Sequence, residues 1–200
     1  MENKGTISFP DGRRRRDLVA PRETELDIDL WNLMSEVMSE AELATSTYGA
    51  LVHSDVHSRQ VYVDGSCIGP QPARRAGAGI RWGMGSHLNR AFRVPGEQTN
   101  NRAELFSILG VLATTPPSIP LQFYTDSEYS INMIVHWGPI IAQTGWECIN
   151  VWFFRHGDVL QAIQFQIRRR RGPIVFHHIR GHSGNNENEE ADRLAKAGAS

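Results

Sequence analysis

The order of the expected strands and helices is the feature that most limits how this chain can fold. Three strand-like segments, QVYVDGSC (60–67), AGAGIRWGM (76–84) and HLNRAFRV (87–94), follow one another with short connections. This spacing predicts an antiparallel meander. A region in which helical and strand-like segments alternate comes next. Such an order predicts an α/β domain whose mixed sheet is covered by helices.

The alternating region supplies the rest of this domain. Four segments are interpreted as helices, at 100–115, 127–137, 157–171 and 186–199. Two further strand-like segments, LQFYTDS (121–127) and IVFHHIRG (174–181), lie between them. The order β-β-β-α-β-α-α-β-α predicts a five-stranded mixed sheet with three antiparallel strands and two parallel ones.

The first 58 residues differ in composition from the rest of the chain. They contain 6 Lys and Arg against 11 Asp and Glu, whereas the remaining residues are mildly basic. Residues 1–26 carry prolines, glycines and the run RRRR at 13–16, which predicts a flexible N-terminal lead. In residues 27–58, apolar side chains recur at helical spacing from Asp27 to about Ala44, which predicts an amphipathic helix followed by a linker.

Asp64 interrupts the first strand-like segment. The pair Asp64-Gly65 is a strong hairpin-turn signal, so a turn is one interpretation of VYVDGSC. The other interpretation places Asp64 within the strand and depends on three more acids. Glu104 lies in the first turn of the helix at 100–115, Asp126 lies at the end of the strand at 121–127, and Asp192 lies in the last helix.

The topology can bring these four acids to one end of the sheet. If the strands that carry Asp64 and Asp126 are neighbours, the two helices add Glu104 and Asp192 to the same place. Carboxylates gathered in this way repel one another unless cations neutralise them. Hard oxygen ligands favour Mg²⁺ or Mn²⁺. We therefore interpret Asp64 as a metal ligand.

Four sequence blocks resemble those of type 1 ribonuclease H: VYVDGSC, QTNNRAEL, YTDSEYSIN and IRGHSGNNENEEADRLAK. The resemblance implies a ribonuclease H-like fold for residues 59–200. It implies an endonuclease that hydrolyses the RNA strand of RNA–DNA hybrids with two Mg²⁺ ions, for which Mn²⁺ can substitute, on Asp64, Glu104, Asp126 and Asp192. It also assigns His182 to a mobile loop that assists proton movement and product release. VPGEQTNNRAEL and TGWECIN are similar to ribonuclease H segments of retroelements.

Recognition of the hybrid requires a side chain that reads the 2′-OH of RNA. Asn100 and Asn101 precede Glu104 and offer amide groups for this hydrogen bond, with Gln98 and Thr99 beside them. Asn132 follows Asp126 and is predicted to touch a base or sugar in the minor groove. Helix capping is the structural alternative for Thr99 and Asn100, and the two roles are compatible.

The chain departs from the family in the groups expected to hold phosphates. GPIIAQTG (138–145) contains no Lys or Arg where many members have a basic protrusion, and Glu97 stands where an arginine is common. The asparagine common before the following helix is replaced near His156. These differences predict a weak hold on the hybrid, unless Arg74-Arg75 or the run at 168–171 supplies it. A structural alternative for the run at 168–171 is that it forms the solvated end of a helix, where positive charge is favourable.

Other function classes are disfavoured by composition. The chain has two cysteines, Cys67 and Cys148, and no apolar run of about 20 residues. We expect an intracellular monomer, in nucleus or cytoplasm, without a membrane segment; protein partners stay open. Zinc is not expected, because His177 and His178 are strand neighbours that face opposite sides. The alternative function is a weakly active nucleic-acid-binding module from a retroelement polyprotein. A different phosphodiesterase on the same fold is disfavoured by TNNRAEL and GHSG.

Overall fold

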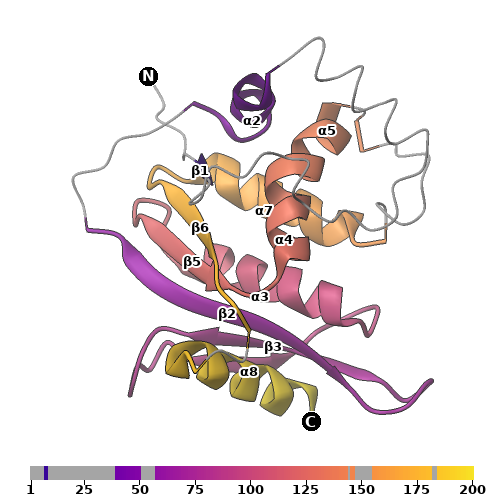
Figure 1. The fold of residues 1–200 in the computed structure, drawn as a ribbon. Coiled ribbons are helices and arrows are strands. Elements are labelled where there is room, and N and C mark those ends of the chain that lie inside the picture. Colours follow the sequence, from indigo (N-terminus) through magenta and orange to yellow (C-terminus); the bar gives the residue numbers. More distant parts are fainter. Residues whose placement is uncertain (1–6, 9–38, 51–56, 144, 147–154, 182–183) are drawn as a thin grey trace.

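The computed structural model describes residues 7–8, 39–50, 57–143, 145–146, 155–181 and 184–200. Its centre is one mixed sheet with the strand order β1-β6-β5-β2-β3-β4 (Figure 1). The strands are β1 (Ile7–Ser8), β2 (Arg59–Ile68), β3 (Arg75–Arg81), β4 (Arg90–Arg93), β5 (Leu121–Thr125) and β6 (Ile174–His178). β2, β3 and β4 pair antiparallel, and β2, β5 and β6 pair parallel. The predicted five-stranded sheet is confirmed, and β1 extends it by pairing with β6.

Helices cover both faces of this sheet (Figure 1). The helices are α2 (Glu40–Tyr48), α3 (Asn100–Thr114), α4 (Glu128–Asn132), the π-helix η2 (Met133–Trp137), α5 (Gly138–Gln143), α7 (Gly157–Arg169) and α8 (Asn186–Ala199). On one face, Val61 and Val63 of β2 join Leu105 and Ile108 of α3 in the main hydrophobic core. On the other face, α8 packs against β2, β3 and β4. Burial of these apolar faces is the main force that holds the layers together.

Two glycines allow helices to approach β2 and β3 closely from opposite faces. A Cβ atom on Gly65 would lie 2.2 Å from the backbone nitrogen of Glu104 in α3. A Cβ atom on Gly79 would lie 2.1 Å from the carbonyl oxygen of Ala191 in α8. Any larger residue would push a helix away from the strand. The interpretation of Asp64-Gly65 as a hairpin turn is wrong, because β2 continues to Ile68 and Asp64 pairs with Gly79.

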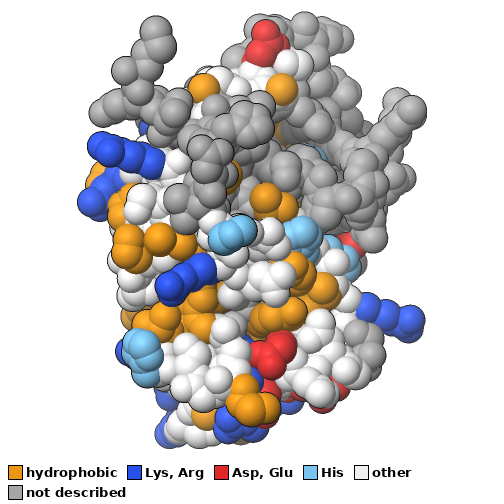
Figure 2. Space-filling view, turned by 90° about the vertical axis from the view of Figure 1, so that its left-hand side faces the viewer, with side chains coloured by type: hydrophobic (Ala, Val, Ile, Leu, Met, Phe, Trp, Pro, Cys, Tyr) orange, Lys and Arg blue, Asp and Glu red, His pale blue; other side chains and the backbone are white. Residues whose placement is uncertain are grey.

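Three neighbouring strands, β2, β5 and β6, carry a row of stacked aromatic rings. The ring centroids of Tyr62 and Tyr124 are 4.8 Å apart, and those of Tyr124 and His177 are 4.6 Å apart. The side of the molecule in Figure 2 shows hydrophobic and histidine side chains gathered among polar ones.

Within the described ranges, no helix has the length and apolar character required to cross a membrane.

The N-terminal helix differs from its prediction. Residues 27–38 of the predicted helix, and all of the predicted flexible lead except Ile7–Ser8, lie outside the described residues. Ser39 has an extended backbone and forms a capping box with Glu42, so α2 starts at Glu40. A helix that runs unbroken from Asp27 is therefore wrong, because Ser39 satisfies the first free N–H groups of α2 as an N-cap. The helix also extends past Ala44 to Tyr48.

Candidate active site

The sheet itself brings Asp64 and Asp126 together. β2 and β5 are parallel neighbours in which Tyr62 pairs with Tyr124. Asp64 and Asp126 each lie two residues beyond that pair, so the two acids reach the same level on adjacent strands. Asp126 directly follows the last residue of β5, where a chain leaving the sheet exposes its side chain.

Glu104 reaches the same point from α3. Gly65 permits the close contact of α3 with β2, and Glu104 is 5 % exposed. One carboxylate oxygen each from Asp64, Glu104 and Asp126 lie within 4.8 Å of one another. Among the described residues, these three side chains form the cluster that could hold a metal ion, and all three ligands are carboxylates. Hard oxygen ligands at this spacing are those that Mg²⁺ and Mn²⁺ prefer.

The electrostatics of the three acids favour a bound cation. Burial raises the pKa of the Asp64 carboxyl from its ordinary value to about 7, and the charge of Asp126 adds to this rise. Burial also raises the pKa of Glu104 well above its usual range, and the charge of Asp64 contributes next. The buried Oε2 atom of Glu104 has no hydrogen-bond partner among the described residues. Without a cation, the site therefore retains protons that exposed carboxylates would release near neutral pH.

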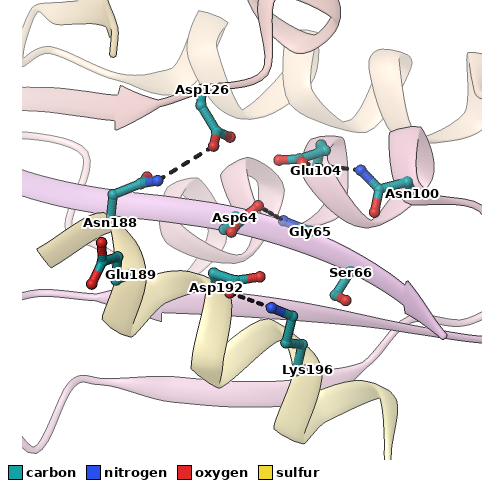
Figure 3. Close-up of a pocket in the computed structure, with 10 residues that line it drawn as sticks. All are labelled: Asp64, Gly65, Ser66, Asn100, Glu104, Asp126, Asn188, Glu189, Asp192 and Lys196. Atoms are coloured by element: carbon teal, nitrogen blue, oxygen red, sulfur yellow. Dashed lines mark hydrogen bonds and ion pairs between the residues drawn. The ribbon is translucent and has the colours of Figure 1, made fainter. Parts of the chain in front are cut away.

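Asp192 lines the same pocket from α8 but does not belong to the tight group of three (Figure 3). Its Oδ2 atom lies 2.5 Å from Nζ of Lys196, one helical turn further along α8. Lys196 therefore supplies a positive charge beside the acids. The predicted grouping of four acids is present as three close carboxylates and a fourth that is held by a lysine.

Ser66 and Glu189 line the pocket but were not identified from the sequence, and the same holds for two residues that contact the acids, Asn188 and Lys196. Asn188 is 3 % exposed, and its Nδ2 atom donates to Oδ2 of Asp126 at 3.3 Å. Its Oδ1 atom is buried without a partner among the described residues. Asn188 and Lys196 lie four positions from Asp192, and residues four apart share one face of a helix. That spacing is the signal from which they could have been found.

The predicted substrate contacts are not all at the pocket. Asn100 lines it and donates to Oε1 of Glu104 at 3.3 Å, while Asn101 is exposed next to it. Thr99 is the N-cap of α3 and accepts from the backbone of Arg102. The amide of Gln98 bonds to the backbone of Ala76, Val94 and Gly96, so it fixes the loop before α3.

Two further predicted site residues are not part of the described pocket lining. Asn132 is 2 % exposed and is not among the residues that line the pocket, so its contact with a base or sugar stays a prediction. Asn132 lies where α4 meets η2, within a run of buried residues from Ser130 to Trp137. His182 lies outside the described residues. Gly181, just before it, contacts the pocket: a Cβ atom there would lie 2.4 Å from Oδ2 of Asp126.

Glu97 has close neighbours at the start of α3 and α7. Its Oε2 atom lies 2.8 Å from Nε of Arg155 and 3.9 Å from Nδ1 of His156. His156 is buried, and its Nε2 atom is 3.4 Å from Oγ1 of Thr99. Burial lowers the pKa of His156. Glu97 therefore occupies, with a positive partner, the region between two helix N-termini that would otherwise attract an anion.

The arginine run at 168–171 is partly used within the fold. Arg170 is 1 % exposed and donates to the carbonyl oxygens of Thr115, Pro116 and Ile119. Arg168 donates to the carbonyl oxygen of Thr47. The prediction that this run is a solvated helix end is therefore wrong for Arg170, and these two arginines are committed to holding loops and helices together.

Comparison with known proteins places this geometry in a family. The RNase H family model matches residues 57–200. Ribonuclease H1 of Rattus norvegicus is 39% identical over 165 residues, which cover 75% of this chain and 55% of that protein. Ribonuclease H1 of Homo sapiens is 40% identical over 146 residues, which cover 70% and 49%. The chain thus spans about half the length of these mammalian relatives.

A bacterial relative and two solved structures agree with this match. Ribonuclease HI of Pseudomonas aeruginosa is 33% identical over 138 residues, which cover 69% of this chain and 90% of that protein. LC9-RNase H1, a type 1 RNase H with the type 2 active-site motif, matches with a TM-score of 0.58 and 26% identity, over 73% of this chain and 74% of its own. The foamy viral protease–reverse transcriptase in complex with dsDNA, at 23% identity and a TM-score of 0.57, covers 70% and 92% and shares the fold. The chain belongs to the RNase H family.

Proposed function

We propose that this chain hydrolyses the RNA strand of RNA–DNA hybrids with two Mg²⁺ ions held by Asp64, Glu104, Asp126 and Asp192. The observation that carries the proposal is the group of three carboxylates within 4.8 Å, contributed by two adjacent strands and α3. The membership of the chain in the RNase H family and the order of the four sequence blocks support the choice of substrate. Mn²⁺ is an alternative ion with the same ligand preference.

The residues present fit divalent cations. Three close acids, two of them with raised pKa values, lose their mutual repulsion when positive charge is added. When bound, two such ions activate a water molecule and stabilise the leaving oxygen of a phosphodiester. The protein contributes the fixed positions of its carboxylates, since β2, β5 and α3 are held by the sheet and core. Asp192 becomes available once its contact with Lys196 loosens.

Asn100 and Asn101 are the groups best placed to recognise RNA. Asn100 bridges the acids and the pocket surface, because its amide already donates to Glu104. Asn101 is exposed on the same first turn of α3. Their amides both donate and accept hydrogen bonds, as does the 2′-OH that distinguishes RNA from DNA. We assign His182 to proton transfer beside this site, since Gly181 places the start of its segment against Asp126.

A weakly active binding module is the second candidate. The ion pair between Glu97 and Arg155 favours it, because that acid repels phosphate and uses a cation that phosphate could contact. Both side chains are nearly half exposed, so water screens the pair and little free energy is needed to separate it. Weak binding is therefore expected to raise KM more than it lowers kcat.

The decisive experiment compares substrates. End-labelled RNA of one sequence is incubated with the purified protein and Mg²⁺ as an RNA–DNA hybrid, as single-stranded RNA and as an RNA duplex. The proposal predicts internal cleavage of the RNA in the hybrid alone, and loss of that cleavage with EDTA. Equal cleavage of all three RNAs would contradict the substrate assignment. Hybrid binding without cleavage would favour the binding module.

A further inference from the structure

The arginines of the described residues differ in their partners. Several of them form ion pairs with carboxylates: Arg81 with Glu187, Arg102 with Asp158, Arg155 with Glu97 and Arg193 with Glu190. Arg74, Arg75 and Arg93 are exposed, and no Asp or Glu side chain in the described ranges forms an ion pair with any of them. We call these three residues the hairpin arginines: Arg74 and Arg75 lie at the end of the β2–β3 hairpin, and Arg93 lies beside it on β4, paired with Gly77 of β3.

Two of the hairpin arginines, Arg75 and Arg93, contact the C-terminal end of α8. Nη1 of Arg75 donates to a backbone oxygen of Ser200 at 3.0 Å, and Nη1 of Arg93 donates to the carbonyl oxygen of Ala199 at 3.5 Å. Arg74 precedes Arg75 in the loop and is exposed. Three positive charges therefore gather on one small part of the surface, which favours an anionic partner.

Two structural elements connect this cluster with the catalytic pocket. Asp192 and Ser200 are eight residues apart along α8, or about 12 Å along its axis. Asp64 and Ile68, which pairs with Arg75, are four residues apart on β2, or about 13 Å. Figure 3 shows Ser66 and Lys196 between the acids and the hairpin end of β2. Measured along both elements, the hairpin arginines thus lie about 12–13 Å beyond the acids.

Helix capping explains part of this arrangement. Positive side chains near the C-terminus of a helix stabilise it by about 0.3–1 kcal/mol each, and Arg75 and Arg93 are in contact with that end of α8. Capping does not explain Arg74, which forms no hydrogen bond or ion pair with α8 among the described residues. It also does not explain why three exposed arginines lie near one another, with no ion pair to a described Asp or Glu side chain.

We propose that the hairpin arginines bind backbone phosphates of the RNA–DNA hybrid on one side of the scissile bond. This inference rests on the proposed hydrolysis of hybrids at the carboxylate pocket. A nucleic-acid strand carries one phosphate per about 3.4 Å of helix axis, so a distance of 12–13 Å corresponds to about four nucleotides. The contact holds substrate and transition state equally, so it lowers KM and leaves kcat unchanged. It supplies part of the phosphate binding that the region near Glu97 lacks.

The test uses the double variant Arg74→Glu/Arg75→Gln, in which glutamine retains a donor for the end of α8. The matched control is Arg90→Glu, an exposed arginine at the opposite end of β4. We expect the double variant to raise KM for a 20-base-pair hybrid by about tenfold with unchanged kcat. The salt dependence of binding should become shallower by about 0.9 per lost phosphate contact. The control should match wild type, and unchanged KM and salt dependence in the double variant would overturn the inference.

Trimmed hybrids add a positional readout. Two shorter hybrids are prepared in which the cleavage site lies two base pairs from one end or from the other. The double variant should show its raised KM with the hybrid that keeps the phosphates about four nucleotides from the cleavage site on the arginine side. With the other hybrid, which lacks those phosphates, it should match wild type. An equal defect with both hybrids would contradict a localised contact. Binding is also measured without metal by fluorescence anisotropy. If wild type binds hybrid with this arginine dependence but does not cleave it, the proposed activity fails while the binding surface stands.

Discussion

Asp64→Asn is expected to stabilise the metal-free protein while it removes activity. The carboxyl of Asp64 has its pKa raised from 3.8 to about 7, mainly by burial. Between these values the native state binds more protons than the unfolded state, so stability decreases as pH rises through this range. At pH 8 the penalty reaches about 4 kcal/mol, because a tenfold change in a protonation equilibrium corresponds to about 1.4 kcal/mol. Asparagine carries no charge and avoids this penalty.

The substitution also preserves the local hydrogen bond. The backbone N–H of Gly65 donates to Oδ1 of Asp64 at 2.7 Å, and the amide oxygen of asparagine can accept the same bond. For a chain of this size, 4 kcal/mol corresponds to a rise in Tm of about 10 °C. At pH 4 the Asp64 carboxyl is protonated in the native state, and in the unfolded state, with its ordinary pKa of 3.8, it is about 40% protonated. The stabilisation should therefore fall below about 1 kcal/mol.

Thermal or urea unfolding of both proteins in EDTA at pH 8 and pH 4 measures this difference. Glu190→Gln is a suitable control, since Glu190 lies on α8 outside the pocket and pairs with the exposed Arg193. Mg²⁺ should then stabilise wild type more than Asp64→Asn, because a ligand stabilises the state that binds it. Equal stability of wild type and Asp64→Asn at pH 8, or a gain that persists at pH 4, would refute the electrostatic account.

Three further outcomes follow from the site. His182→Ala should reduce kcat by about 10- to 100-fold with little change in hybrid binding, and equal turnover across neutral pH would exclude a proton-transfer role. Glu97→Gln should lower KM severalfold and steepen its salt dependence, because it removes a repulsion and makes Arg155 available to phosphate; Glu97→Arg should help less, since it places a second cation beside Arg155. Asn188→Ala should reduce kcat more than KM, because Asn188 orients Asp126, and partial rescue by Asn188→Ser would separate a lost hydrogen bond from a lost fold.

The sequence predicted the framework of the site because strand position determines where a side chain lies. Asp64 and Asp126 occupy corresponding places on two strands, so pairing of those strands was sufficient to bring them together. The hairpin-turn interpretation of Asp64-Gly65 failed for a tertiary reason. Gly65 is required by the contact with α3, and no local pattern in β2 indicates that contact.

Other features depended on packing or on local hydrogen bonds that the periodicity of apolar residues does not report. The start of α2 is fixed by the reciprocal bonds of Ser39 and Glu42, which lie inside an otherwise continuous apolar pattern. Asn132 is polar, yet the packing around the junction of α4 and η2 buries it. The pairing of Glu97 with Arg155 joins residues 58 positions apart and required the fold to be known.

The central claim is that the cluster formed by Asp64, Glu104 and Asp126 is the site of Mg²⁺-dependent cleavage of RNA in a hybrid. The most direct measurement is the initial rate of hybrid cleavage at saturating Mg²⁺ by wild type, Asp126→Asn and Glu190→Gln, with circular dichroism to verify that each is folded. We predict that Asp126→Asn loses cleavage by at least about a thousandfold, as expected when a group that positions catalytic metal ions is removed, and that Glu190→Gln retains the wild-type rate. Cleavage by folded Asp126→Asn at the rate of wild type would contradict the assignment of this site.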